Sequence, residues 1–136
     1  MIGHGKLVLV VDEVESERQE TVLVLEQAGF TVVQACDGLD ALSEMHQQHF
    51  DVVVTDCHIP YLNGLDLLAQ SRVIWSDIPI IMFSKTRYTR EMAEARGAFG
   101  WIRKSSDPGI LLSIVAMAVE QSVEWESPHA MEQVGA

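Results

Sequence analysis

The chain has 136 residues, of which 48% are hydrophobic and 21% are charged, a size and composition typical of a single globular domain. Its formal net charge of −11 argues against direct nucleic-acid binding by this domain, because phosphate backbones would be repelled. No apolar stretch approaches the roughly 18 residues of a membrane span, and no signal-peptide core is present, so we expect a soluble, cytoplasmic protein with no membrane partner.

Short apolar runs, rich in β-branched or aromatic residues, recur along the chain and predict five strands. The predicted strands are Leu7–Val11, Thr31–Ala35, Val52–Thr55, Ile78–Phe83 and Phe99–Ile102. The first and third runs are continuous rather than alternating, which is typical of parallel strands covered on both faces.

Segments with helical spacing separate the strands. Ser16 and Gln19 resemble a capping box for a helix that ends at Gly29. Asp37, Asn63 and Asp107 precede the other helical patterns as N-caps, over residues 39–50, 65–74 and 109–123. This alternation predicts an α/β fold with a doubly wound, five-stranded parallel sheet. We place the domain at residues 6–122 and read residues 123–136 as a C-terminal extension or linker.

Three acids follow predicted strands. Asp12 and Glu13 follow the first strand, and Asp56 ends the third. In a doubly wound sheet such strand ends share the edge where ligands bind. Three carboxylates a few ångströms apart repel one another unless one is protonated or a cation lies among them, so the group predicts a Mg²⁺ site. Asp12 and Glu13 alone would be read more simply as acids at a helix N-terminus.

Two further strand ends complete the set. Ser84 follows the fourth strand and Lys104 the fifth, so a hydroxyl and an ammonium should reach the same edge. Alone, each would be read as a capping hydroxyl or a solvated cation. Together with the acids and a metal they make a receptor for a phosphoryl group, for which Asp56 is the candidate covalent acceptor.

Five ordered motifs resemble the receiver domains of two-component response regulators, and in particular the chemotaxis-regulator-like ones. These motifs are VLVVDE, ACDGLDAL, VVVTDCHIPYLNGLDLL, IPIIMFS and GAFGWIRK. The resemblance covers about residues 6–122 and implies a flavodoxin-like (βα)5 fold with strand order 2-1-3-4-5. It implies that Asp56 is the phosphoacceptor and that Lys104 contacts the phosphoryl group. Asp12 and Glu13 would hold Mg²⁺ with Asp56 and the main-chain carbonyl of His58, whose imidazole would then be incidental.

The resemblance also implies a signalling mechanism rather than an enzyme, with at most self-phosphorylation and self-dephosphorylation. A histidine kinase or phosphotransfer protein would supply the phosphoryl group. The switch pair, Ser84 and Trp101, would then rearrange, and the face made by the fourth helix, fifth strand and fifth helix would be reshaped for an output domain or partner protein. Pro60 and Gly64 match the turn after the acceptor.

Charge is unevenly distributed. Residues 85–104 hold six basic and two acidic residues, a net +4 against −15 for the rest of the chain. This window covers most of the expected output face, which makes that face a candidate surface for a partner, and a homodimer through its helix is a further candidate. A solvated helix of mixed charge is the plain alternative.

Three positions depart from the family pattern. Lys85 stands where a small residue is usual, and it could crowd the site or form a second phosphate contact. Ser105 replaces the usual proline after Lys104, and a cis bond before a residue other than proline costs about 2.5–4 kcal/mol, so the loop could be trans and differently shaped. Trp101 is bulkier than the usual tyrosine or phenylalanine, and core packing is its plain alternative role. A second function class is therefore a receiver-like interaction module that does not switch by phosphorylation. A hydrolase or flavin binder on the same fold is a third, although no glycine-rich phosphate loop follows the first strand.

Overall fold

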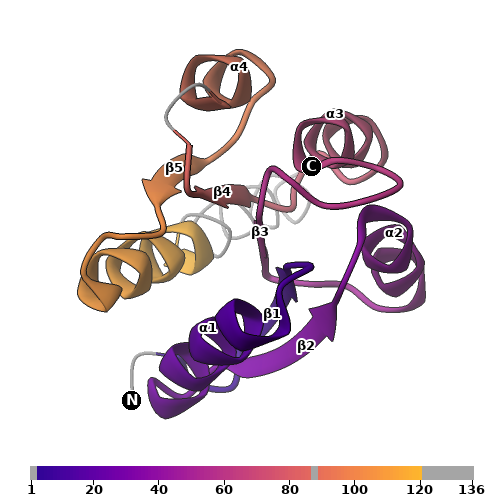
Figure 1. Ribbon diagram of the computed structural model, residues 1–136. Helices are drawn as coiled ribbons and strands as arrows, with labels where there is room; N and C mark the ends of the chain where they lie inside the picture. Colours follow the sequence, from indigo (N-terminus) through magenta and orange to yellow (C-terminus); the bar gives the residue numbers. More distant parts are fainter. Residues whose placement is uncertain (1–2, 87–88, 121–136) are drawn as a thin grey trace.

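Five parallel strands form one sheet with the order β2-β1-β3-β4-β5 in the computed structural model of the chain (Figure 1). The structure describes residues 3–86 and 89–120. The elements are β1 (Leu7–Val11), α1 (Glu15–Gln27), β2 (Thr31–Ala35), α2 (Gly38–Gln47), β3 (Val52–Thr55), α3 (Gly64–Ile74), β4 (Ile80–Ser84), α4 (Arg90–Ala95) and β5 (Gly100–Arg103). A C-terminal helix follows over residues 108–120. The predicted fold class and strand order are confirmed.

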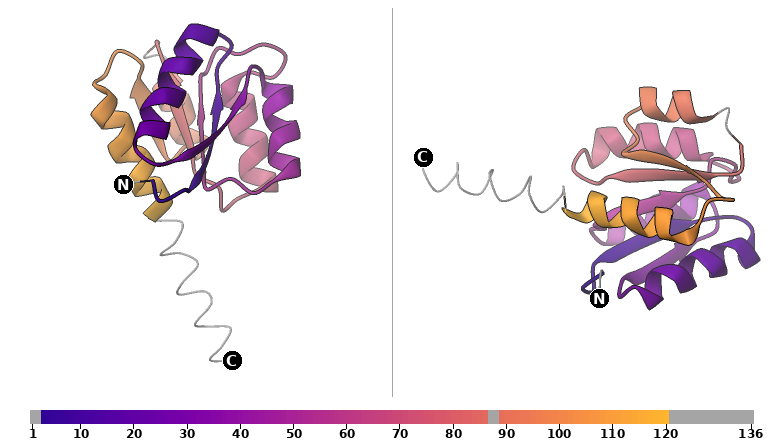
Figure 2. Two further views of the ribbon diagram at one scale, coloured as in Figure 1. Left: turned by 90° about the horizontal axis from the view of Figure 1, so that it is seen from below. Right: turned by 90° about the vertical axis from the view of Figure 1, so that its left-hand side faces the viewer.

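Helices cover both faces of the sheet, as Figure 2 shows in its left view. One core lies between α2, α3 and α4 and one face of the sheet, to which the strands contribute side chains such as Leu9, Val53 and Met82. The other core packs α1 and the C-terminal helix against the alternate set, represented by Val8 and Val54. Because alternate strand residues point to opposite faces, a continuous apolar strand serves both cores at once.

Side-chain caps begin three of the helices where the sequence predicts them. The carboxylate of Asp37 accepts from the Asp40 N–H at 2.7 Å, and the amide oxygen of Asn63 accepts from the Asp66 N–H at 2.9 Å. Asp107 accepts from the Gly109 N–H at 2.7 Å at the start of the C-terminal helix. Each bond satisfies a donor in the first turn that has no partner within the helix.

The predicted start of the first helix is wrong. The helix begins at Glu15 with Val14 as its N-cap residue, and no side chain caps it from Ser16. The reason is that Asp12, just after β1, accepts from the Val14 N–H at 3.0 Å and turns the chain into the helix earlier. The predicted end is confirmed, because Gly29 has a φ of 96° in the left-handed region that favours glycine.

The bounds of β4, β5, α2 and α3 also differ from the predicted ones by one to three residues. β4 ends at Ser84 rather than Phe83, and β5 ends at Arg103 rather than Ile102. β4 begins at Ile80 rather than Ile78, because Pro79 has no N–H to donate to the ladder and contributes only its carbonyl, which accepts from Val53. β5 begins at Gly100 instead of Phe99, and α2 ends at Gln47 rather than residue 50. The predicted extension over residues 123–136 lies outside the described residues. Within the described ranges, no helix has both the length and the hydrophobicity to cross a membrane.

Candidate functional site

Asp12 and Asp56 lie next to each other at the carboxyl edge of the sheet. Asp12 follows β1 and Asp56 follows β3, and the register of these neighbouring strands pairs Val11 with Thr55. The two acids are only 3% and 8% exposed. The structure therefore brings together two of the three acids that the strand ends predict, in surroundings that water barely reaches.

Lys104 supplies the cation between these acids. Its Nζ lies 2.7 Å from Asp12 Oδ2 and 2.7 Å from Asp56 Oδ2. Its side chain is 8% exposed. Burial alone would favour the neutral amine, but hydrogen bonds and charge from Asp12 and Asp56 outweigh it and raise the pKa of Lys104 above its ordinary value. The lysine therefore stays an ammonium ion and compensates two buried negative charges.

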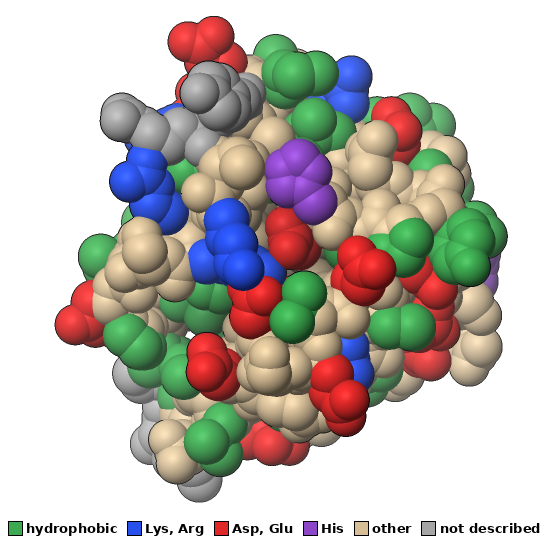
Figure 3. Space-filling view, in the orientation of Figure 1, with side chains coloured by type: hydrophobic (Ala, Val, Ile, Leu, Met, Phe, Trp, Pro, Cys, Tyr) green, Lys and Arg blue, Asp and Glu red, His purple; other side chains and the backbone are tan. Residues whose placement is uncertain are grey.

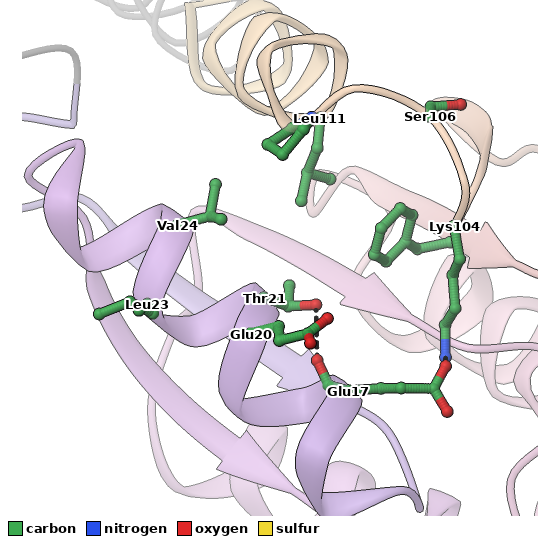
Figure 4. Close-up of a pocket in the computed structure, with 10 residues that line it drawn as sticks. Glu17, Glu20, Thr21, Leu23, Val24, Lys104, Ser106 and Leu111 are labelled. Atoms are coloured by element: carbon green, nitrogen blue, oxygen red, sulfur yellow. Dashed lines mark hydrogen bonds and ion pairs between the residues drawn. The ribbon is translucent and has the colours of Figure 1, made fainter.

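Glu17, on α1, is a third acid at this ammonium, and the sequence reasoning missed it. Its Oε1 lies 3.2 Å from Lys104 Nζ, a contact drawn in Figure 4. Its Oε2 lies 3.0 Å from Lys85 Nζ. Burial opposes ionisation, but hydrogen bonds from Lys85 and Lys104 prevail and lower the pKa of Glu17. In the sequence Glu17 is only one of several acids near a helix start, where acids are common, so nothing there marks it.

Glu13 is exposed and has a different position from the buried pair. Among the residues that the structure describes, no group of three or more His, Cys, Asp or Glu side chains is arranged to hold a metal ion. Two of the three predicted acids, Asp12 and Asp56, share the ammonium of Lys104, which lies 2.7 Å from each of them. The donors nevertheless fit Mg²⁺, since two neighbouring carboxylates and waters are a set that this ion uses. The three-acid Mg²⁺ site stays a prediction.

The loop after β3 fixes the Asp56 side chain from the main chain. The His58 N–H donates to Asp56 Oδ1 at 3.1 Å. Gly64 opens α3 against this loop, and its N–H donates to the Cys57 carbonyl at 2.9 Å. A Cβ atom at Gly64 would collide with the Asp56 carbonyl. Glycine is thus required for α3 to begin so close to the candidate acceptor. Burial raises the pKa of the Cys57 thiol, which keeps it protonated and a weak nucleophile.

Ser84 lies at the end of β4, fully buried, and joins a hydroxyl network. Its Oγ lies 3.4 Å from Thr86 Oγ1, and the Thr86 N–H donates to it at 3.3 Å. Thr86 Oγ1 also lies 3.1 Å from His58 Nε2. The imidazole of His58 therefore has a defined partner, and it links the loop after β3 to the loop after β4.

Trp101, on β5, is partly buried and held by a second threonine. Its Nε1–H donates to Thr89 Oγ1 at 3.0 Å, and the Thr89 hydroxyl donates to the Thr86 carbonyl at 3.2 Å. The Arg90 guanidinium lies 5.8 Å from the centre of the indole ring. Trp101 packs against the core and is also connected to Ser84 through Thr86 and Thr89, and its role as a switch stays a prediction.

The structure shows where two departures from the family pattern lie, Lys85 and the bond between Lys104 and Ser105. Lys85 turns toward Glu17, and its side chain is 65% exposed. The described contacts of the Asp56 carboxylate are with His58 and Lys104, so Lys85 does not cover that carboxylate. The bond between Lys104 and Ser105 is trans.

The basic window carries less unpaired charge than its composition suggests. Lys85 pairs with Glu17, Arg90 with Glu94 at 3.0 Å, and Arg96 with Asp66 at 3.8 Å. Lys104 belongs to the buried cluster. Most of the basic residues that the structure describes in residues 85–104 are thus paired with acids, and Arg87 lies outside the described residues. A partner surface that relies on this charge stays a prediction.

A groove of about 330 Å³ runs between α1 and the C-terminal helix (Figure 4). Apolar side chains line most of it, among them Leu23, Val24, Phe83, Pro108 and Leu111. Glu17 and Lys104 line the groove at the carboxyl edge of the sheet. Acidic side chains gather over α1 and the nearby strand ends in the space-filling view (Figure 3). A mostly apolar groove therefore shares Glu17 and Lys104 with the cluster of charged side chains around Asp56.

Comparisons with known proteins agree with this geometry. Residues 8–116 match the family model of the response regulator receiver domain. The chain is 36% identical over 118 residues to the CAI-1 autoinducer sensor kinase/phosphatase CqsS of Vibrio cholerae serotype O1, covering 83% of this chain but only 17% of that protein. It is 33% identical over 109 residues to the chemotaxis protein CheY-3 of Vibrio cholerae, covering 76% of this chain and 84% of that one.

A solved structure extends the comparison. The response regulator protein TrrA of Thermotoga maritima, in complex with Mg²⁺-BeF, superposes with a TM-score of 0.79 at 25% identity, covering 83% of this chain and 98% of that chain. The family match, the fold and the buried acids at the carboxyl edge of the sheet lead to one conclusion. The chain belongs to the response regulator receiver domain family of two-component signalling systems.

Proposed function

We propose that this domain accepts a phosphoryl group on Asp56 from a histidine kinase or phosphotransfer protein. The observation that supports the proposal is the ammonium of Lys104, placed 2.7 Å from Asp56 Oδ2 in a nearly closed site. An Asp56 carboxylate oxygen attacks phosphorus, the P–N bond of the donor phosphohistidine breaks, and the imidazole leaves with the electron pair of that bond. The product is an acyl phosphate whose added charge faces Lys104.

Asp12 and Asp56, with Glu13 and the main-chain carbonyl of His58, are the groups proposed to hold Mg²⁺. The ion would neutralise charge on the phosphoryl oxygens. Two arguments support it: the paired carboxylates at this edge, and the relative TrrA, whose structure was solved with Mg²⁺-BeF. Asp12 would have to exchange its contact with Lys104 for the metal, which frees an N–H of Lys104 for the phosphoryl group.

The proposed output is a change in the face formed by α4, β5 and the C-terminal helix. Ser84 and Trp101 are the proposed switch pair, and the hydrogen bonds through Thr86 and Thr89 give them a physical connection. The partner would be an output domain, another protein or a second copy of the chain. The proposed domain covers residues 6–122 of a cytoplasmic signalling protein, with residues 123–136 as an extension or linker, and it acts as a receiver rather than a turnover enzyme.

Intact-mass measurement tests this proposal. Wild-type protein is incubated with Mg²⁺ and acetyl phosphate, a small acyl-phosphate donor, and the mass of one added phosphoryl group is expected. Asp56→Asn should abolish the adduct. Asp77→Asn is the matched control, because Asp77 is exposed at the opposite edge of the sheet, just before β4, and should leave the adduct intact. Failure of the wild-type protein to form an adduct would contradict the proposal.

A further inference from the structure

The Glu17 carboxylate bridges two ammonium ions, only one of which belongs to the family pattern. Its Oε1 lies 3.2 Å from Lys104 Nζ, and its Oε2 lies 3.0 Å from Lys85 Nζ. Lys104 in turn lies 2.7 Å from Asp56 Oδ2. Lys85 is therefore one carboxylate away from the ammonium that contacts the proposed acceptor.

The hydrogen-bonding capacity of the two lysines differs. An ammonium has three N–H donors, and Lys104 already serves three carboxylates, those of Asp12, Glu17 and Asp56. Lys104 must give up one of them to reach a phosphoryl oxygen. Lys85 has one acceptor among the described residues, Glu17, and its side chain is 65% exposed. It keeps two donors for a newly arriving anion without breaking its own ion pair.

The charges favour the same conclusion. Asp12, Glu17 and Asp56 carry three negative charges against the two positive charges of Lys85 and Lys104. Phosphorylation of Asp56 adds further negative charge to a partly desolvated edge, where an additional cation lowers the electrostatic cost.

The backbone places Lys85 correctly for this role. Lys85 follows Ser84 at the end of β4, and Lys104 follows Arg103 at the end of β5, the residue paired with Ser84. The Lys104 N–H donates to the Ser84 carbonyl at 2.9 Å. The two lysines thus leave neighbouring strands at the same level, and Glu17 holds both on the α1 side of the acceptor.

We propose that Lys85 is a second phosphoryl-binding cation, held by Glu17 next to Lys104 at the carboxyl edge of the sheet. The inference rests on the proposed function, because it needs a phosphoryl group on Asp56. It also gives a role to Lys85, which departs from the family pattern. Of the two alternatives for this long cation, crowding the site and contacting the phosphoryl group, the inference selects the second.

The test is the rate at which wild type, Lys85→Met and Lys85→Arg form the phosphoryl adduct from acetyl phosphate in saturating Mg²⁺, followed by intact mass. A charge-assisted hydrogen bond to the transferring group predicts a rate about tenfold lower for Lys85→Met. Lys85→Arg should recover most of it. The deficit of Lys85→Met should shrink as salt is added, because an exposed cation is screened, and a purely structural role would not show this.

A matched control is Lys6→Met, which removes the same charge just before β1, at the opposite edge of the sheet, and should leave the rate unchanged. Urea midpoints of wild type and Lys85→Met should agree closely, because an exposed ion pair contributes little to stability. An unchanged or faster rate in Lys85→Met, with a normal wild-type adduct, overturns this inference and leaves the proposed function standing. Absence of the adduct from the wild type overturns both.

Discussion

Two groups of side chains meet at Asp56, and they differ in the kind of force that joins them. On one side lies an ionic cluster, consisting of Asp12, Glu17, Asp56, Lys85 and Lys104. On the other lies a hydroxyl chain, consisting of His58, Ser84, Thr86, Thr89 and Trp101. The ionic cluster responds to any change of charge on Asp56, whereas the hydroxyl chain is directional and short-ranged.

Under the proposed function the two groups would have separate tasks within one small site. Phosphorylation of Asp56 would change the charge of the ionic cluster first, and the cluster would have to rearrange because each of its members is paired with another. The hydroxyl chain runs from the loop beside Asp56 to the indole of Trp101, so a shift of its first members is passed on as a change in hydrogen-bond geometry. The ionic cluster would respond to the added charge, and the hydroxyl chain would carry the structural change to Trp101.

The largest effect is expected from Lys104→Met. The substitution leaves Asp12 and Asp56, both nearly closed off from water, without their shared cation. Loss of one partner from a buried ion pair costs about 3–5 kcal/mol of unfolding free energy, measured by urea denaturation. Because the pKa of Lys104 is raised, its contribution is fully present below the ordinary value of 10.5 and is lost only as the pH rises through the folded-state pKa.

Mg²⁺ separates two explanations of that loss. If the unpaired carboxylates cause it, millimolar Mg²⁺ should restore part of the stability of Lys104→Met and should do so more than in wild type, since binding to the folded state is stabilising. Equal stability of the variant and wild type without metal would contradict the view that Lys104 compensates these acids.

The ionic cluster also shows how far sequence reasoning can go. Asp12, Asp56 and Lys104 could be predicted because each directly follows a strand, and parallel strand ends share an edge. Glu17 could not, because its role depends on which face of α1 turns toward Lys104. Thr86 and Thr89 escaped for a similar reason, since they lie after β4, in a region where no periodic pattern indicates the direction of a side chain.

The element boundaries likewise divide into those that the sequence pattern predicts and those that it does not. The first three strands begin and end as predicted, because continuous β-branched runs define them. Two of the boundaries that failed, the starts of α1 and β4, depend on single hydrogen-bonding groups. Pro79 cannot donate to the sheet, and Asp12 begins α1 from outside the helix. Pattern thus identifies elements, whereas individual donors and acceptors set their ends.

The hydroxyl chain is best broken at Thr89→Val. This change leaves the indole N–H of Trp101 without its acceptor and removes the donor to the Thr86 carbonyl. A partly buried donor without a partner costs about 1–3 kcal/mol. In a background with Trp75 and Trp125 replaced by phenylalanine, the emission of Trp101 should shift toward that of an exposed indole. Thr89→Ser keeps the hydroxyl and should preserve wild-type emission, and an unchanged spectrum in the valine variant would show that this bond does not hold the ring.

A smaller effect is expected between His58 and Thr86. The two side chains are 3.1 Å apart and link the loops after β3 and β4. A double-mutant cycle of His58→Ala and Thr86→Val should give a coupling energy of about 1 kcal/mol in urea unfolding, the size of one exchanged hydrogen bond. Additive single effects would mean that the hydroxyl chain begins at Ser84 and does not include the imidazole.

The smallest effect, and the one that best separates the two groups, is the pH dependence of Glu17→Gln. Burial raises the pKa of Glu17, but hydrogen bonds from Lys85 and Lys104 outweigh it and lower the pKa below the ordinary value of 4.5. A lowered carboxyl pKa stabilises the fold above the unfolded-state value, and this stabilisation is lost as the pH falls through the folded-state pKa. Wild type should therefore exceed Glu17→Gln by about 0.5 kcal/mol at neutral pH, and the difference should vanish in acid and shrink with added salt. Thr89→Val should show neither dependence, because no charge is lost, and a salt-sensitive deficit in that variant would mean that the ionic cluster and the hydroxyl chain are not separable.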